Sequence, residues 1–482
     1  MVNIIVELSK YLMIICVAVY AYECFSVFGY QSEQKKRSIL RRQNFMMFAM
    51  HFMAYLVLYL KTDEKKVLYL YGMEVVFFIA VILLYTKIYP KVSRLIVNNM
   101  CMLFAIGFIM LTRLKFNNAV KQCIIAAAAI LLSLVIPIII RKVKILSQWE
   151  WLYAGIGLVA LLIVFLFAGK SGGAKLGFQI AGIGVQPSEL VKITFVFFVA
   201  ARLQKSTKFK DVVLTTILAA THVLLLVMST DLGAGLILFV VYLVMLYVAT
   251  RQPLYVVAGV SAGSVAAVGA YYLFSHVRTR VEVWRGPISP QTAGGHQVAQ
   301  ALFAIGTGSW FGMGLYQGAA NTIPVATEDF IFAAIAEELG LIFALCLILI
   351  CISCYVMFLN IAMQLHNIFY KLVALGLGTC YIFQTFLTIG GVTKFIPLTG
   401  VTLPLVSYGG SSVLSTVIMF AVIQGLYVLR EDEEESIERE KARQERQKTV
   451  SGRRHTDPYG RRSGQPSRKA SGRYEERRTG RR

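Results

Sequence analysis

Residues 233–250 read GAGLILFVVYLVMLYVAT, eighteen consecutive residues without a charged side chain. About twenty apolar residues in a helix cross the ~30 Å hydrocarbon core of a bilayer. The chain holds too many runs of this kind for one soluble core to bury. The sequence therefore predicts an all-α integral membrane protein, a multi-span helical bundle of about thirteen transmembrane helices. The other predicted spans lie near residues 4–28, 45–61, 67–88, 96–112, 119–140, 148–169, 188–203, 212–229, 255–275, 331–358, 368–390 and 404–429.

Composition and charge also indicate a membrane protein. The chain of 482 residues is 57% apolar, whereas soluble chains are about 45–50% apolar. Much of the net charge of +22 lies in short loops between apolar runs and in the C-terminal segment, so we predict no nucleic-acid partner. Residues 431–482 are charged and end in a Gly/Ser/Pro-rich stretch. They predict a disordered cytoplasmic tail near an anionic membrane surface.

Lys and Arg mark every second connection between the predicted spans. Residues 34–42 read QKKRSILRR, and later basic connections carry Lys91, Arg141, Lys208 and Arg251. Such residues accumulate in cytoplasmic loops. With thirteen spans, this pattern predicts a multi-pass protein of the cell membrane with its N-terminus outside and its C-terminus in the cytoplasm.

Two predicted outer connections are long, at residues 169–187 and 276–328. Loops of such length are usually functional or disordered. The second contains Trp284, Trp310 and Phe311, so we expect it to form short re-entrant or interfacial helices. Its glycine-rich residues 306–318 lack the G-K-[ST] of a phosphate-binding loop.

Charged residues near the ends of spans are candidates for function, because charges at membrane depth are costly. Glu189 and Lys192 lie one helical turn apart where a span begins. They predict either a capped helix start with a local ion pair or a cationic contact to an anionic lipid headgroup. Asp231 lies at the outer end of another span and is expected to cap a helix.

Asp329, in TEDFIFAAIAEELG, stands where the long outer loop meets an apolar run, and Glu337 and Glu338 follow two turns later. A partly desolvated carboxylate has a raised pKa and can act as a general base. Arg278, Arg280 and Arg285 open the same loop, and Lys394 lies near the last outer loop. Because arginine suits phosphate groups, these cations predict an anionic substrate.

Five motifs occur in a fixed order along residues 96–430. They are QPSELVK (186–192), DLGAG (231–235), GGHQVAQALFAIGTGSWFGMGLYQG (294–318), DFIFAAIAEELG (329–340) and IPLTGVTLPLVSYGGSS (396–412). This series resembles the SEDS family (shape, elongation, division and sporulation), whose members include FtsW, RodA and SpoVE. The family usually has ten spans, so the resemblance implies a SEDS core at 96–430, additional spans in 1–95 and a tail at 431–482.

The resemblance implies a bacterial peptidoglycan glycosyltransferase, which polymerises lipid II at the outer face of the membrane during division, elongation or sporulation. Undecaprenyl diphosphate is the leaving group. The implied partners are lipid II, undecaprenyl-diphosphate-linked glycan, a class B penicillin-binding transpeptidase and other divisome or elongasome membrane proteins. Two other readings of the chain are a flippase of the lipid-linked precursor and a non-catalytic division scaffold that recruits enzymes through its tail.

By resemblance, Asp329 takes the role of catalytic base. The implied substrate-binding residues are Lys192, Glu189, Arg280, Arg278, Gln297, Glu338, Ser407, Tyr408 and Gly409. A divalent cation, Mg²⁺ or Mn²⁺, would find candidate ligands in Asp329 and Glu328, although the chain shows no metal-ligand spacing.

The chain departs from the usual pattern beside the aspartate. Val325 replaces a glutamate, and Thr327 and Glu328 replace a histidine and a threonine. These replacements leave the aspartate in place but change the charge around it.

Overall fold

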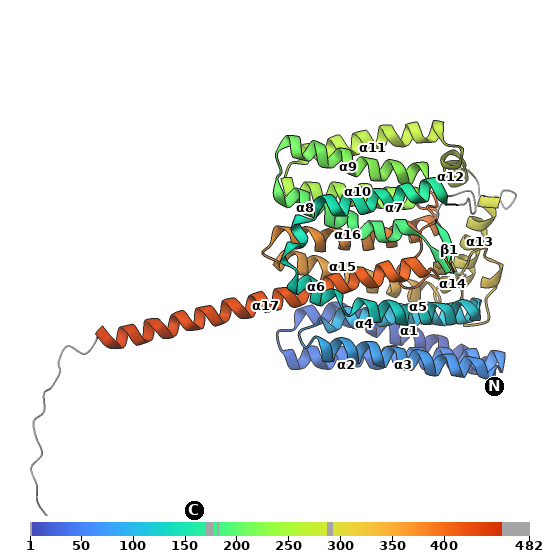
Figure 1. The fold of residues 1–482 in the computed structure, drawn as a ribbon. Coiled ribbons are helices and arrows are strands. Elements are labelled where there is room, and N and C mark those ends of the chain that lie inside the picture. The colour runs from blue at the N-terminus through green and yellow to red at the C-terminus, as the bar shows by residue number, and fades with distance from the viewer. Residues whose placement is uncertain (1, 169–176, 181–182, 287–292, 456–482) are drawn as a thin grey trace, which may run out of the picture. The chain divides into compact units, whose positions relative to one another are not determined.

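The computed structural model describes residues 2–168, 177–180, 183–286 and 293–455. In these residues, twelve helical segments are long and apolar enough to cross a membrane. Figure 1 shows that they run side by side as a bundle. The helices that form these segments are α1 (Val2–Ser26), α2 (Glu33–Thr62), α3 (Lys65–Ile88), α4 (Arg94–Leu114), α5 (Phe116–Ser133) with α6 (Ile136–Lys142), α7 (Glu150–Phe167), α9 (Phe209–Met228), α10 (Leu232–Thr250), α11 (Pro253–Leu273), α15 (Leu341–Gln364), α16 (Ile368–Val392) and α17 (Gly410–His455).

The helix α8 (Pro187–Lys205) corresponds to the remaining predicted span. It carries four ionisable side chains and is not among the twelve. Three of them, Glu189, Lys192 and Arg202, are buried against neighbouring helices. The helical membrane fold is thus confirmed, whereas the count of thirteen spans stays a prediction.

Short elements gather between the long helices. They are η1 (Val27–Gly29), η2 (Lys144–Gln148), the strands β1 (Phe178–Ile180) and β2 (Ile183–Val185), α12 (Ser275–Arg285), α13 (Ala293–Gly308), η3 (Ala320–Thr322) and α14 (Ile331–Leu339). The strands form an antiparallel hairpin with Phe178 opposite Val185. The predicted short helices of the 276–328 connection are present as α12 and α13, and Figure 1 places them with α14 and β1 at one end of the bundle.

Two predicted spans begin differently in the structure. The run 331–358 is not one helix, because Gly340 adopts a φ of +91° and separates α14 from α15. The run 404–429 does not begin as a helix either, since α17 starts only at Gly410. The preceding residues 396–409 form an irregular segment that reaches the candidate site.

The segment predicted as a disordered tail from residue 431 begins as a helix in the structure. α17 continues as a helix to His455, and residues 456–482 lie outside the described range. Residues 431–449 are rich in Glu, Lys, Arg and Gln, which favour helices. Glu435 and Arg439 also form an i,i+4 ion pair. By its contacts, the chain divides into two units, Met1–Glu431 and Asp432–Arg482.

The first three helices pack on the rest of the first unit. α1 lies against α2 and α15, and a polar junction joins it to the core. There, Asn99 Oδ1 accepts hydrogen bonds from Tyr20 Oη (3.1 Å) and Cys24 Sγ (3.2 Å), and Asn99 Nδ2 donates to Ser353 Oγ (3.3 Å). The central helix α4 is buried along its whole apolar window.

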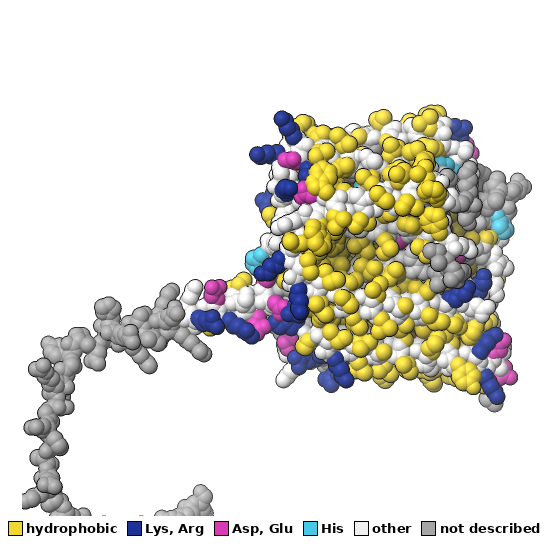
Figure 2. Space-filling model, in the orientation of Figure 1, with side chains coloured by type: hydrophobic (Ala, Val, Ile, Leu, Met, Phe, Trp, Pro, Cys, Tyr) yellow, Lys and Arg dark blue, Asp and Glu magenta, His cyan; other side chains and the backbone are white. Residues whose placement is uncertain are grey.

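The outer helices α3, α7, α9 and α11 expose much of their apolar surface. In Figure 2, hydrophobic side chains cover the face between the two ends of the bundle, and many Lys and Arg side chains lie toward the ends. This distribution suits a molecule surrounded by lipid.

Candidate active site

Asp329 lies in a tight turn directly before α14. Two hydrogen bonds to its backbone carbonyls hold this turn against the segment before α17. The Tyr408 amide donates to the Thr327 carbonyl at 2.8 Å, and Ser407 Oγ donates to the Glu328 carbonyl at 2.6 Å. Ser407 and Tyr408, predicted as substrate contacts, therefore fix the backbone next to Asp329.

Arg280 reaches the same place from α12. Its Nη1 donates to the Thr399 carbonyl at 3.0 Å. The next residue, Gly400, has a φ of +73°, and a Cβ built on it would lie 3.6 Å from Asp329 Oδ2 and 3.7 Å from Arg280 Nη2. The carboxylate and the guanidinium thus converge on Gly400, where the positive φ would strain any residue with a side chain.

The surroundings of Asp329 suit a general base. Burial raises the pKa of its carboxyl to about 6, the Glu328 charge adds to this rise, and Arg280 opposes it. Burial also raises the pKa of Glu328, which Lys115 opposes. The pKa of Arg280 is lowered by burial and raised again by Asp329 and Asp231. A carboxylate with a pKa near 6 is largely ionised at neutral pH and still basic enough to accept a proton.

A second polar cluster lies at the start of α8 and α10. As predicted, Asp231 caps a helix, since its Oδ1 accepts from the Ala234 amide at 3.1 Å. Its Oδ2 accepts from Ser188 Oγ at 2.8 Å and from Gln186 Nε2 at 3.0 Å. The cluster therefore joins the QPSE segment to the DLGAG segment.

Glu189 and Lys192 form the local ion pair that was one of the two predicted outcomes, with Nζ and Oε2 2.8 Å apart. Lys192 is only 1% exposed and also donates to Gln384 Oε1 at 2.6 Å. Gln384 in turn donates to the Thr402 carbonyl at 3.0 Å. Through Gln384, the pair is thus linked to the backbone at Thr402, and both charged side chains are buried.

Glu338 has a different neighbourhood. Its Oε1 lies 2.9 Å from Arg113 Nε, and its Oε2 accepts from the Tyr316 amide at 3.2 Å. The Arg113 guanidinium also stacks 4.0 Å from the centre of the Tyr316 ring. Within the described residues, no contact joins Glu338 to Asp329. Glu338 and Arg113 instead hold residues 316–321 in place through hydrogen bonds to that loop.

The remaining predicted contacts are dispersed. Arg278 is exposed and donates to the Tyr272 carbonyl at 3.0 Å, away from Asp329. Gln297 is partly exposed on α13, next to Val298 of the cavity described below. The Gly409 amide donates to Gln122 Oε1 at 3.3 Å.

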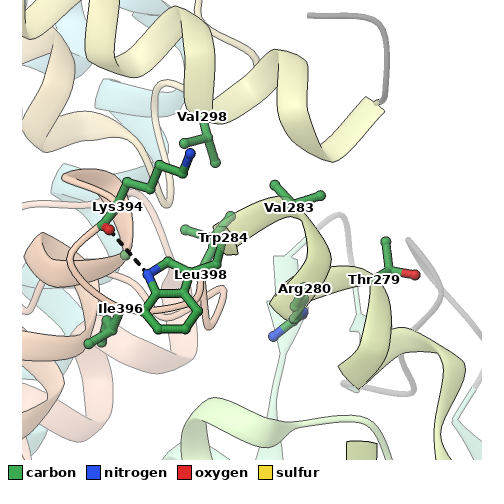
Figure 3. A pocket seen from close by; sticks show the side chains of 9 residues that line it. Thr279, Arg280, Val283, Trp284, Val298, Lys394, Ile396 and Leu398 are labelled. Carbon is green, nitrogen blue, oxygen red and sulfur yellow. Dashed lines mark hydrogen bonds between the residues drawn. The ribbon is translucent and has the colours of Figure 1, made fainter. Parts of the chain in front are cut away.

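A mainly apolar pocket lies beside Arg280. Val283, Trp284, Val298, Ile396 and Leu398 supply most of its apolar lining. Figure 3 shows these side chains converging from α12, α13 and the segment after α16, with Trp284 Nε1 bonded to the Lys394 carbonyl at 3.2 Å. Lys394 Nζ donates to the Gly286 carbonyl at 2.7 Å, which fastens α12 to this segment.

Several contributors to the site were missed at the sequence level. Gln384 and Gln122 were overlooked although both are polar residues within apolar runs, a signal that could have indicated them. Thr399 and Gly400 act through backbone position, which residue type does not reveal.

A metal would have few protein ligands. Among the described residues, no group of three or more His, Cys, Asp and Glu side chains could hold an ion. Asp329 and Glu328 remain as two carboxylates close enough to influence each other. This donor set fits a Mg²⁺-like ion that takes one or two carboxylates and completes its shell with substrate phosphates and water.

Comparison with known proteins identifies relatives across most of the chain. Residues 93–431 match the family FTSW_RODA_SPOVE, described as "Cell cycle protein". Peptidoglycan glycosyltransferase RodA of Mycobacterium tuberculosis (strain ATCC 25618 / H37Rv) is 31% identical over 363 residues, covering 69% of this chain and 77% of that protein. The probable peptidoglycan glycosyltransferase FtsW of Caulobacter vibrioides is 32% identical over 308 residues, covering 62% and 77%.

Solved structures share the fold. One, reported as "Structural coordination of polymerization and crosslinking by a peptidoglycan synthase complex", has a TM-score of 0.60 at 23% identity and covers 70% of this chain and 98% of that chain. The rod shape determining protein RodA of Thermus thermophilus has a TM-score of 0.53 at 20% identity and covers 70% and 96%. The resemblance seen in the motif series is therefore confirmed, and the chain belongs to the FtsW/RodA/SpoVE family, the SEDS family.

Proposed function

We propose that this chain is a peptidoglycan glycosyltransferase that polymerises lipid II. The observation that carries the proposal is the convergence of Asp329 and Arg280 on Gly400, beside an apolar cavity. A base, a cation and an apolar surface together match a substrate with a sugar hydroxyl, a diphosphate and a lipid. The relatives named peptidoglycan glycosyltransferase support the same reaction.

In the proposed reaction, the 4-hydroxyl of one disaccharide attacks the anomeric carbon of another. The new O4–C1 bond forms while the bond from C1 to the diphosphate oxygen breaks, and undecaprenyl diphosphate leaves with the bonding electrons. Asp329 accepts the hydroxyl proton and later releases it to water. General-base help of this kind typically contributes ~10²–10⁴-fold.

Charge on the leaving diphosphate needs a counterpart, and Arg280 is the proposed one. Its guanidinium is oriented by the Thr399 carbonyl, so it is held in place before the substrate binds. A divalent cation held by Asp329 and Glu328 would neutralise further diphosphate charge when bound. The Glu189–Lys192 pair, Ser407 and Tyr408 position the backbone around these groups.

The proposed sidedness follows the charge pattern, with the Asp329 end of the bundle outside and the C-terminal segment in the cytoplasm. A partner transpeptidase of the class B penicillin-binding type is also proposed. The fold shared with a chain from a peptidoglycan synthase complex supports this pairing.

The deciding experiment compares the wild type with Asp329→Asn in vesicles that contain lipid II. Asp329→Asn keeps the shape of the side chain but removes its basicity, so glycan strands should fall by at least about 100-fold. Glu282→Gln, on the same helix as Arg280, is the matched control and should polymerise like the wild type. If Asp329→Asn polymerises normally, or if wild-type protein only moves lipid II between leaflets, the proposal fails.

A further inference from the structure

A second pocket lies far along the bundle from Asp329, between α2, α3 and α4. Its polar lining consists of Arg37, Arg41 and Asn44 from α2, Thr86 from α3, and Arg94 and Asn98 from α4. α2 and α3 precede the family match, which begins at residue 93. The pocket is therefore built largely by the additional N-terminal helices and is not accounted for by polymerisation.

Positive charge in this pocket is not neutralised by the residues that line it. Arg37, Arg41 and Arg94 are all exposed, and no Asp or Glu lines the pocket. Described acids nearby in sequence have other partners, since Glu33 pairs with Lys36 and Glu23 pairs with Arg42. Arg94 is also the first residue of α4, whose helix dipole adds positive potential at this end. Three guanidiniums around one cavity favour a phosphate group.

The pocket also offers an acceptor. Asn44 Oδ1 is buried and has no hydrogen-bond partner among the described residues. Its neighbour Asn98 is occupied, because Nδ2 donates to the Leu40 carbonyl at 3.0 Å and to Gln43 Oε1 at 3.1 Å. An unpartnered buried acceptor is costly unless a ligand hydroxyl or water donates to it. Phosphate donors together with a hydroxyl acceptor suit a phosphodiester that carries a hydroxylated headgroup.

The surroundings favour a lipid over a soluble phosphate. Val76, Ile79 and Leu83 of α3 are 66%, 45% and 46% exposed. They follow one another at helical spacing toward Thr86, so they form an apolar stripe that leads to the pocket. A headgroup in the pocket could thus extend its acyl chain along α3. Basic pockets between transmembrane helices on the cytoplasmic side are known to bind anionic lipid headgroups.

We propose that Arg37, Arg41 and Arg94 bind the phosphodiester of an anionic phospholipid from the cytoplasmic leaflet, with Asn44 accepting from a headgroup hydroxyl. This site is separate from the Asp329 site. The packing of the additional helices against the start of α4 would then depend on the lipid composition of the membrane.

The test uses full-length protein in detergent and native mass spectrometry with dioleoyl phosphatidylglycerol as the probe. The competitor is dioleoyl phosphatidylcholine, which lacks net charge and headgroup hydroxyls. Wild-type protein should retain the phosphatidylglycerol preferentially. Each arginine near a membrane surface contributes roughly fivefold, so the triple variant Arg37→Gln, Arg41→Gln and Arg94→Gln should bind about 100-fold more weakly.

The matched control removes three positive charges at the same predicted membrane side, by Lys142→Gln, Lys144→Gln and Lys210→Gln. These lysines are exposed and do not line the pocket, so salt screens their effect on a lipid held there and binding should change less than about threefold. Equal losses in the two triple variants would mean that net charge, not this pocket, retains the lipid. Wild-type protein that binds glycerol 3-phosphate as tightly as the lipid, or an acidic peptide in its place, would also overturn the proposal.

A variant that fills the pocket tests the proposal without removing any arginine, so a loss of binding can be separated from a failure to fold. Thr86→Trp keeps all three arginines but occupies the cavity, and the Thr86 hydroxyl donates only to backbone carbonyls of its own helix. This variant should lose phosphatidylglycerol while its thermal unfolding temperature stays near that of the wild type. A folded Thr86→Trp protein that retains the lipid would place the binding site elsewhere.

Discussion

At the scale of single residues, opposing charges tune Asp329. Burial and the neighbouring Glu328 raise its pKa, and Arg280 lowers it, with a result of about 6. Glu328 stands where the family resemblance would place a threonine. Its charge is therefore a feature of this chain that should be visible in the pH dependence of the reaction.

The pH profile gives the first prediction. A base works only when it is deprotonated, so the kcat/KM of lipid II polymerisation should rise through about pH 6 and level off above it. Because the Glu328 charge raises this pKa, Glu328→Gln should move the midpoint to lower pH. Polymerisation assays between pH 5 and 8 measure both profiles.

The control for this prediction is Glu33→Gln, an identical change at an exposed residue paired with Lys36. It should leave the midpoint where it is in the wild type. A Glu328→Gln midpoint that moves to higher pH would contradict the assigned electrostatics.

Asp329 and Arg280 could be predicted from the sequence because charged residues near apolar runs are conspicuous. The ion pair of Lys192 with Glu189 could be predicted too, but the distant partners of Lys192 and Glu338 could not, since they come from other helices. Lys192 meets Gln384, and Glu338 meets Arg113. Which buried charges face a site and which face each other depends on tertiary packing.

At the scale of elements, the turn after α13 is bound closely to the junction of α14 and α15. The Met313 and Gly314 amides donate to the Glu337 and Glu338 carbonyls at 2.9 and 2.8 Å. Gly312 has a φ of +76°, and a Cβ there would lie 2.4 Å from the Glu338 carbonyl oxygen. This contact leaves room only for glycine at position 312.

Arg113 and Glu338 support this junction from inside, which gives the second prediction. Arg113 is 6% exposed and Glu338 is fully buried. Arg113→Met would leave a buried carboxylate without its partner and should lower the free energy of unfolding by about 3–5 kcal/mol. The double variant with Glu338→Gln should recover part of the loss.

Unfolding can be followed with a thiol-reactive dye, because seven of the eight free cysteines are buried in the folded protein. The exposed Lys121 of α5 supplies the control, and Lys121→Met should change stability by less than about 0.5 kcal/mol. If Arg113→Met unfolds at the wild-type temperature, the pair does not support the junction.

The helices themselves were largely predictable, because a long apolar run leaves the backbone in lipid little choice but helix. The positions at which an apolar run is interrupted by a non-helical segment could not be predicted. Gly340 ends α14 through its φ of +91°, and the 396–409 segment remains irregular because its carbonyls bind Arg280, Gln384 and Gln122. Such breaks depend on partners from elsewhere in the chain, and they are the places where the site forms.

At the scale of the whole molecule, α15 runs from one end of the first unit to the other, so contacts at its two ends show which parts of the chain lie at each end. Near its start, Lys10 Nζ of α1 donates to the Gly312 carbonyl at 3.3 Å, and Tyr11 packs on Phe311 with ring centres 5.6 Å apart. Near its other end, Arg430 of α17 donates to Gln364. Since α15 is long enough to span the membrane, the N-terminus and Arg430 should lie on opposite sides, as thirteen spans require.

This topology gives the last prediction, tested by labelling introduced cysteines in intact cells with a membrane-impermeant maleimide. Asp63→Cys, in the exposed connection between α2 and α3, should react because that connection is proposed to lie outside. Gln34→Cys, in the basic first turn of α2, should react only after the cells are opened. The native cysteines give little background, since only Cys16 is not buried. The reverse pattern would place Asp329 in the cytoplasm, away from any lipid II polymerisation at the outer face, and would overturn both the orientation and the proposed function.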